Sequence, residues 1–177
     1  MPDSFAAFRT DDTCLQPTQP MERHMKTRVN YAKASPEAFK AMMAFENYVQ
    51  TSGLDRRFIH LIKLRASIIN GCAFCVDMHV KESRHDGLSE QWINLMSVWR
   101  ESPVYTEQER ALLGWVDAVT KIAETGAPDE AFETLKAHFS DEDIVKITVA
   151  IGAINTWNRI AVSFRSQHPI DAAAKAA

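Results

Sequence analysis

The sequence lacks three features that would assign it to a large class of proteins. It has no block of basic residues, and 20 Lys and Arg are outnumbered by 23 Asp and Glu, for a net charge of −3. A nucleic-acid partner is not expected, because such proteins carry basic patches. No apolar run reaches the roughly 18 residues of a membrane-spanning helix. The opening MPDSFAAFRTDD lacks the basic and apolar regions of a secretory signal, so we expect a cytoplasmic protein with no membrane partner.

Cysteine is scarce, and no pattern of extended strands is present. Only three cysteines occur, and in a cytoplasmic protein a closely spaced pair indicates redox or metal chemistry rather than a structural disulfide. No stretch alternates polar and apolar residues with period two between hairpin turns. With 177 residues, 46% of them hydrophobic, the chain is long enough to bury one core.

What the sequence does contain is a succession of helix signals. Ser35-Pro36-Glu37 combines a cap, a proline at the first helical position and an early acid, and Thr106 with Glu109 forms a capping box. The expected helices cover residues 36 to about 52, 56–70, 72 to about 86, 89 to about 102, 106 to about 125, 129–138 and 140–164. Short connections favour antiparallel neighbours. We therefore expect an all-α fold, a compact antiparallel bundle of about six to seven helices.

The two ends of the chain differ from this helical domain, which we place at residues 25–167. Residues 1–24 hold three prolines and little periodicity, which predicts an N-terminal extension. Residues 168–177 form a C-terminal tail. Cys14 lies in the extension, in the stretch TCLQPTQP. We expect no role for its thiol; the alternative is a resolving or intermolecular pairing.

The motif Cys72-Ala-Phe-Cys75, followed by His79, is the strongest chemical signal in the chain. At about 100° per residue, the three side chains share one helix face. Asn70-Gly71 ends the preceding helix, so Cys72 lies in the first helical turn, where free N–H groups and the helix dipole favour a thiolate. A thiolate attacks an O–O bond, and a histidine nearby can take the thiol proton. The second thiol can then close a disulfide.

Two other interpretations of this motif remain open. Free cysteines are often buried as small core residues. Alternatively, Cys72, Cys75 and His79 could bind zinc, with His60 or His85 as the fourth ligand. Zinc sites more often place CxxC in a turn, whereas this segment is predicted to be helical. We therefore expect no cofactor and no bound metal.

Two further groups of polar residues interrupt apolar helices. His60, Lys63, Ser67 and Asn70 form a stripe at helical spacing, which either faces solvent or belongs to a site. Asn155, Asn158 and Arg159 interrupt the last helix. Buried polar groups need partners, so these three are expected to bond between helices or across a subunit interface.

With these motifs in view, the sequence resembles the carboxymuconolactone decarboxylase superfamily, specifically its alkylhydroperoxidase D-like branch. The specific stretch is KLRASIINGCAFCVDMH, from Lys63 to His79. The likeness also covers YAKASPEAFKAM, WRESPVYTEQERALLGW and AINTWNRIAVSFR, about residues 25–165 in all. It implies a helical fold, a homo-oligomer and antioxidant peroxidase activity, with Cys75 as peroxidatic cysteine, Cys72 as its resolving partner and His79 as proton acceptor.

The chain departs from that family pattern at two positions. The family places a relay glutamate twelve residues before the first motif cysteine, where this chain has His60. An imidazole passes a proton but supplies no negative charge, so we expect lower activity or a shift to higher pH. Some relatives carry a histidine between the cysteines, where this chain has Phe74. We expect Phe74 to pack in the core or to line an apolar peroxide pocket.

The sequence thus predicts a thiol peroxidase that reduces hydroperoxides through a Cys72–Cys75 disulfide cycle, with Cys75, Cys72, His79 and His60 as site residues. Its expected partners are a hydroperoxide, a dithiol reductant protein and further copies of the chain. One alternative is a non-catalytic metal- or partner-binding module of the same fold. Another is a carboxymuconolactone-type decarboxylase, although decarboxylation needs no dithiol.

Overall fold

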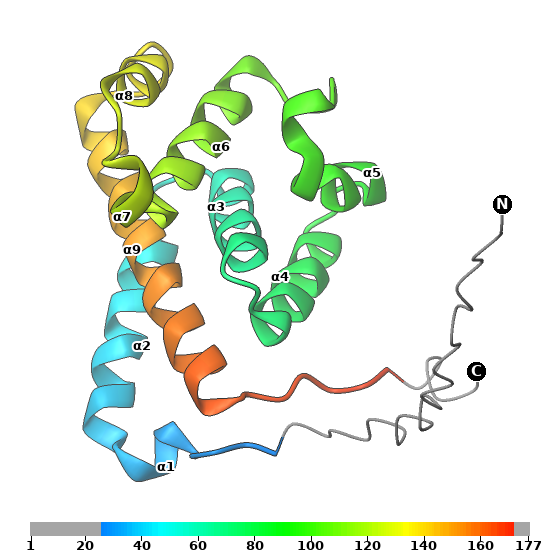
Figure 1. The fold of residues 1–177 in the computed structure, drawn as a ribbon, viewed down its shortest axis with the longest axis vertical. Helices are drawn as coiled ribbons and strands as arrows, with labels where there is room; N and C mark the ends of the chain where they lie inside the picture. Colours follow the sequence, from blue (N-terminus) through cyan, green and yellow to red (C-terminus); the bar gives the residue numbers. More distant parts are fainter. Residues whose placement is uncertain (1–25, 172–177) are drawn as a thin grey trace, which may run out of the picture.

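The computed structural model describes residues 26–171, and the predictions for residues 1–24, including Cys14, lie outside this range. The helices are α1 (Tyr31–Ala34), α2 (Pro36–Thr51), α3 (Arg56–Ile69), α4 (Ala73–His85), α5 (Glu90–Asn94), the 3₁₀ helix η1 (Leu95–Glu101), α6 (Glu107–Thr120), α7 (Ile122–Thr125), α8 (Asp129–Lys136) and α9 (Asp141–Phe164). Every regular element between residues 26 and 171 is helical, so the all-α prediction is confirmed (Figure 1).

The differences from the predicted helices are local. The four-residue helix α1 was not expected, and α7 is the separated end of a longer predicted helix. The expected helix after Ser89 divides into α5 and η1, with a non-helical backbone at Val98. The helix predicted over residues 106–125 bends after Thr120, where Lys121 leaves helical geometry. These breaks have no proline or glycine at the break itself, so no sequence signal marked them.

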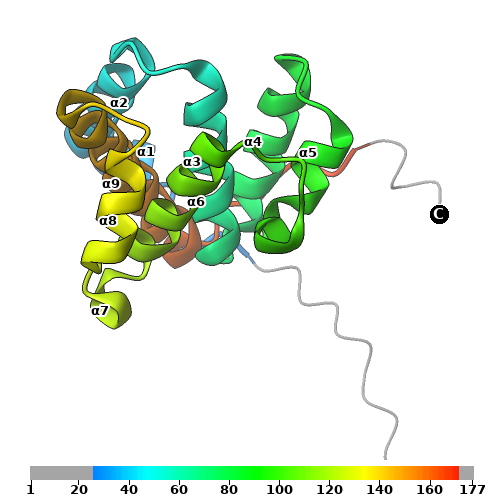
Figure 2. The ribbon, with the colours of Figure 1, turned by 90° about the horizontal axis from the view of Figure 1, so that it is seen from above.

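Helix α3 is the centre of the bundle. It packs most extensively against α6, α9 and α4, which surround it in both views (Figures 1 and 2). Its apolar side chains Leu61, Ile62 and Leu64 are completely buried. Each such side chain contributes roughly 1.5–3 kcal/mol when it leaves water. The core therefore forms around α3, and residues on α3 can contact several helices.

The polar stripe of α3 does not face solvent, so that interpretation is wrong: His60, Lys63 and Ser67 are buried and Asn70 is half-buried. Ser67 is completely buried and accepts a hydrogen bond from Nδ2 of Asn158 (3.1 Å). Asn70 Nδ2 donates to Oδ1 of Asn155 (2.8 Å) and of Asn158 (2.9 Å). The predicted bonding between helices by these asparagines is thus confirmed. This network fixes the end of α3, from which the chain turns into α4, against the middle of α9.

Glu109 joins three helices at the opposite end of α3. Its carboxylate is buried and accepts hydrogen bonds from Arg57 Nε (2.6 Å), Trp92 Nε1 (3.0 Å) and the backbone N–H of Thr106 (2.8 Å). The bond from Thr106 completes the predicted capping box of α6. A single carboxylate therefore caps α6 and holds it to α3 and α5.

We expect Glu109→Ala to lower the free energy of unfolding by about 3 kcal/mol, because it leaves the Arg57 charge and the buried Trp92 N–H without their partner. Urea unfolding followed by circular dichroism measures this loss. Glu107→Ala, in the same helical turn but exposed, serves as the control and should cost less than about 0.5 kcal/mol. Equal losses in the two variants would contradict the bridging role of Glu109.

Candidate functional site

The dithiol lies at the turn between α3 and α4. Gly71 has φ of +64°, a left-handed conformation that glycine adopts without strain, and it reverses the chain after α3. Cys72 follows as the N-cap of α4, so the helix begins at Ala73, one residue later than predicted. Its sulfur accepts a hydrogen bond from the backbone N–H of Cys75 (3.4 Å). The free N–H groups at this helix start therefore face the Cys72 sulfur.

The two cysteines are adjacent and buried. Their sulfur atoms lie 2.7 Å apart as separate thiols, with residue exposures of 1% for Cys72 and 2% for Cys75. Ala161 of α9 and Phe74 pack against the pair. A disulfide requires sulfur atoms about 2.05 Å apart and close Cβ atoms. Oxidation to a disulfide consequently needs little displacement of either side chain.

The two thiols have opposite pKa shifts. A hydrogen bond from the Cys75 thiol and the backbone N–H at the helix start stabilise the Cys72 thiolate and, against the effect of burial, lower the pKa of Cys72 to about 7. Cys75 donates that hydrogen bond to Cys72 and is buried, and both effects raise the pKa of Cys75. The shifts make Cys72 the thiolate of the resting pair and leave the proton on Cys75.

His79 is fixed by a carboxylate that we did not anticipate from the sequence. Its ring is buried (2% exposed), and Nδ1 lies 2.7 Å from Oε2 of Glu82, one turn further along α4. This contact is the largest cause of the lowered pKa of Glu82. Nε2, the other ring nitrogen, is buried and has no hydrogen-bond partner among the described residues. Because an ionised Glu82 can only accept, Nδ1 carries the proton and Nε2 is left as the base.

Cys75, His79 and Glu82 line one cavity of about 290 Å³. The other lining residues are Tyr31, Phe39, Met43, Glu46, Lys63, Phe74, Met78, Ile154, Trp157 and Ala161. Most of this wall is apolar, and Phe74 contributes to it as expected. A larger cavity of about 750 Å³, between α3, η1, α6 and α8, has no cysteine or histidine in its lining. The reactive groups therefore meet in the smaller cavity.

Aromatic contacts hold the outer wall of this cavity in place. Tyr31 of α1 stacks on Phe164 of α9, with ring centroids 6.2 Å apart, and lies 6.1 Å from Phe39 of α2. Phe39 also meets Trp157 of α9 edge to face at 6.2 Å. The backbone N–H of Arg28 donates to the carbonyl of Phe164 (3.0 Å). The short helix α1 thus closes the cavity because it is anchored on the last turn of α9.

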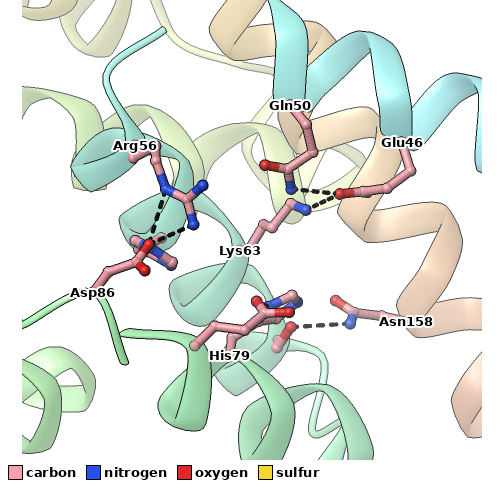
Figure 3. Close-up of polar contacts among 10 residues, drawn as sticks. Glu46, Gln50, Arg56, Lys63, His79, Asp86 and Asn158 are labelled. Carbon is pink, nitrogen blue, oxygen red and sulfur yellow. Dashed lines mark hydrogen bonds and ion pairs between the residues drawn. The ribbon is translucent and has the colours of Figure 1, made fainter. Parts of the chain in front are cut away.

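A buried ion pair forms the charged part of the cavity wall. The Lys63 ammonium of α3 is 4% exposed and contacts Glu46 of α2, which also accepts a hydrogen bond from Gln50 (2.8 Å; Figure 3). Burial raises the pKa of Glu46, but the contact with Lys63 outweighs it and the net pKa is lowered. Glu46 is therefore ionised at neutral pH, beside His79 and Glu82.

His60 is not brought to the cavity that Cys75 lines. Its Nε2 lies 2.7 Å from Oδ2 of Asp86, which also pairs with Arg56 (2.5 Å). Its Nδ1 is buried without a partner among the described residues. His60 lines a second cavity of about 250 Å³ with Gln50, Arg56, Ile59 and Glu82. Glu82 is consequently the residue shared by the two cavities.

The zinc interpretation finds no support in this arrangement. Residues 26–171 bring together no group of three or more His, Cys, Asp or Glu side chains that could hold a metal ion. His79 and His60 are each paired with a carboxylate through one ring nitrogen. His85 lies exposed at the end of α4. The histidines proposed as ligands thus have other partners or lie apart.

Sequence reasoning missed Glu82 and Glu46. Glu82 follows His79 by three residues, a spacing at which helical side chains touch, so its contact was readable from the sequence. Glu46 meets Lys63 only because α2 packs across α3. Nothing in the local sequence of either residue indicates that pairing.

No helix within residues 26–171 is long and apolar enough to cross a membrane.

Comparisons with known proteins identify the family and the fold of this chain. Residues 36–118 match the model of the carboxymuconolactone decarboxylase family. The chain is 38% identical over 139 residues to YdfG, an uncharacterized protein of Bacillus subtilis strain 168, covering 78% of this chain and 95% of that protein. It is 92% identical, with a TM-score of 0.82, to a protein of unknown function from Agrobacterium tumefaciens, described as a candidate antioxidant defence protein AhpD; the match covers 82% of this chain and all of the other.

A more distant solved structure has the same fold. The debrominase Bmp8 superposes with a TM-score of 0.71 at 21% identity, over 81% of this chain and 76% of its own. At this identity the likeness concerns the fold alone. The family match, the relative covered over nearly its whole length and the shared helical fold lead to one conclusion: the chain belongs to the carboxymuconolactone decarboxylase family, in its AhpD-like branch.

Proposed function

We propose that the protein is a thiol peroxidase that reduces hydroperoxides through a Cys72–Cys75 disulfide cycle. The observation that carries this proposal is the meeting of Cys75 and the free Nε2 of His79 at one cavity, with the Cys72 sulfur 2.7 Å behind Cys75. A nucleophile, a base and a resolving thiol are the groups that the cycle requires. Membership of the AhpD-like branch supports the same activity.

Charge and access favour different sulfur atoms. Cys72 has the lower pKa, about 7, but only Cys75 lines the cavity. We assign the attack to Cys75, because a proton that moves across the short contact to Cys72 transfers the negative charge to the sulfur that meets the peroxide. Cys72 then acts as the local proton acceptor and, later, as the resolving thiol. This assignment agrees with the roles that the family resemblance implies.

The cycle balances with these groups. Nε2 of His79 holds the proton that the dithiol loses when it ionises. The Cys75 thiolate attacks the terminal oxygen of ROOH, the O–O bond breaks, and the leaving alkoxide takes that proton from His79 to give ROH. Cys75 is now a sulfenic acid. The Cys72 sulfur attacks it, hydroxide leaves with the Cys72 proton as water, and the disulfide forms. An outside dithiol protein returns two electrons and two protons.

Three further parts of the proposal concern the surroundings of this cycle. The outside dithiol protein is the expected partner, because the buried disulfide needs a reductant that can reach it. We also propose a homo-oligomer and a cytoplasmic location, where a reducing pool maintains thiols. The decarboxylase alternative is disfavoured, since it leaves the adjacent thiols without a use.

Oxidation with one equivalent of cumene hydroperoxide tests the proposal. We expect the reduced protein to lose about 2 Da and two thiols as the disulfide forms. Cys14→Ser, the matched control, should behave the same way, and Cys75→Ser should not lose the 2 Da. Unchanged thiols together with one bound zinc per chain would establish the metal-binding alternative instead.

The role of Cys72 as the resting thiolate predicts a titration near pH 7. With a pKa of about 7, Cys72 is about half ionised at pH 7 and about one-tenth at pH 6. Thiolate absorbance in the ultraviolet should follow this curve and vanish in Cys72→Ser. Cys75→Ala should raise the pKa of Cys72, because the thiolate loses a hydrogen-bond donor. A titration near pH 7 that persists in Cys72→Ser would refute the assignment.

A further inference from the structure

We propose that Glu82, on α4, is the positioning residue that fixes His79 as the base, in place of the carboxylate that the family carries at the position of His60. This inference rests on the proposed function and deepens it. It assigns the proton-handling part of the site to two residues one helical turn apart, and it removes His60 from that role. The geometry of both histidines supports it.

The first argument is the orientation of the His79 ring. A buried imidazole has two nitrogens, and in the neutral form only one carries a proton. The 2.7 Å contact between Nδ1 and Glu82 fixes that proton on Nδ1. Nε2 is then an acceptor, and it is buried with no partner among residues 26–171. An unpartnered buried acceptor is costly, so Nε2 is set to receive a proton from a group in the cavity, such as the Cys75 thiol, and to return it to the leaving alkoxide.

The second argument is the position of His60. Its Nε2 lies 2.7 Å from Oδ2 of Asp86. Arg56 pairs with the same carboxylate oxygen at 2.5 Å (Figure 3). His60 does not line the cavity of Cys75 and His79. Glu82 lies between the two histidines, since it lines both cavities. Glu82 therefore already supplies the carboxylate that contacts His79. A carboxylate at position 60 is not needed for that contact.

The third argument is the charge around Glu82. His79, Lys63 and His60 face its carboxylate, and all three favour the ionised form, so the pKa of Glu82 is lowered. Glu46, the remaining acid of the cavity wall, is neutralised by Lys63. Glu82 keeps a negative charge at neutral pH, which stabilises the protonated ring of His79 during the reaction. Its side chain is 47% exposed, so this carboxylate is partly solvated.

A glutamate introduced at position 60 should consequently bring no gain. It would lie next to Asp86, which already binds Arg56, and near Glu82. Three neighbouring carboxylates repel one another, and the added one would have no cation left to pair with. This proposal thus opposes the expectation, drawn from the family pattern, that the missing glutamate limits this protein.

Glu82→Gln tests the proposal, with Asp77→Asn on the same helix as the matched control. Asp77 pairs with Lys81 outside the cavity. Because an amide can donate as well as accept, the substituted side chain no longer fixes the proton on Nδ1, and it supplies no charge. We expect kcat for cumene hydroperoxide to fall about 100-fold with KM unchanged. Asp77→Asn should stay within about threefold of the unmodified protein, His60→Gln should lose far less than Glu82→Gln, and His60→Glu should show no gain.

A second readout does not depend on peroxide turnover. ¹⁵N NMR of the imidazole should show the proton of His79 on Nδ1 in the reduced protein and in Asp77→Asn, and a mixture of tautomers in Glu82→Gln. If neither the unmodified protein nor any variant reduces peroxide, the proposed function fails. The tautomer of His79 in Glu82→Gln still tests whether Glu82 orients the ring. A Glu82→Gln protein with unchanged tautomer and unchanged kcat would overturn the inference, as would a 100-fold loss in His60→Gln.

Discussion

Helix α3 carries a polar stripe into the interior of the bundle, and every member of that stripe must find a hydrogen-bond or ionic partner there. The partners come from three different helices: Asp86 follows α4, Glu46 lies on α2, and Asn155 and Asn158 lie on α9. The partners fix how the helices pack around α3, and the same packing positions the turn that carries the dithiol. The position of the site therefore depends on the burial of α3, a helix that carries polar as well as apolar side chains.

The site separates the tasks of the proposed reaction among groups with different surroundings. Cys72, at a helix start, stabilises negative charge; Cys75 meets the cavity; and His79, oriented by Glu82, moves protons. A cavity with an apolar wall keeps water away from a sulfenic acid and strengthens the electrostatic contacts inside it. The buried pair of Lys63 and Glu46 gives this wall a charged region without adding net charge.

Much of this arrangement follows from sequence, and the remainder has identifiable causes. The helix start at Pro36, the capping box at Thr106 and the spacing of the two cysteines each depend on neighbours within one helical turn, and each was predictable, although the Ser35 side chain makes no cap hydrogen bond. The burial of the α3 stripe was not, because it depends on residues up to 91 positions away. The division of the helix after Ser89 into α5 and η1 likewise follows from packing rather than from a breaker residue.

The histidine at position 60 shows the limit of a family pattern applied one position at a time. Compared with relatives that carry glutamate there, this chain lacks a carboxylate. The structure supplies one from the next helix, at a spacing that the sequence displayed but that the pattern did not require. A carboxylate on α3 or on α4 can contact the ring of His79. Here the contact comes from Glu82 of α4, which a comparison of motifs overlooks.

The proposed cycle depends on attack of the peroxide by Cys75 rather than by Cys72. Its most direct test is the location of the sulfenic acid in Cys72→Ser, which cannot close the disulfide. After one equivalent of cumene hydroperoxide and trapping with dimedone, peptide mass spectrometry should find the adduct on Cys75. A protein without an adduct at Cys75, together with an adduct on Cys72 in the matched Cys75→Ser variant, would contradict this assignment.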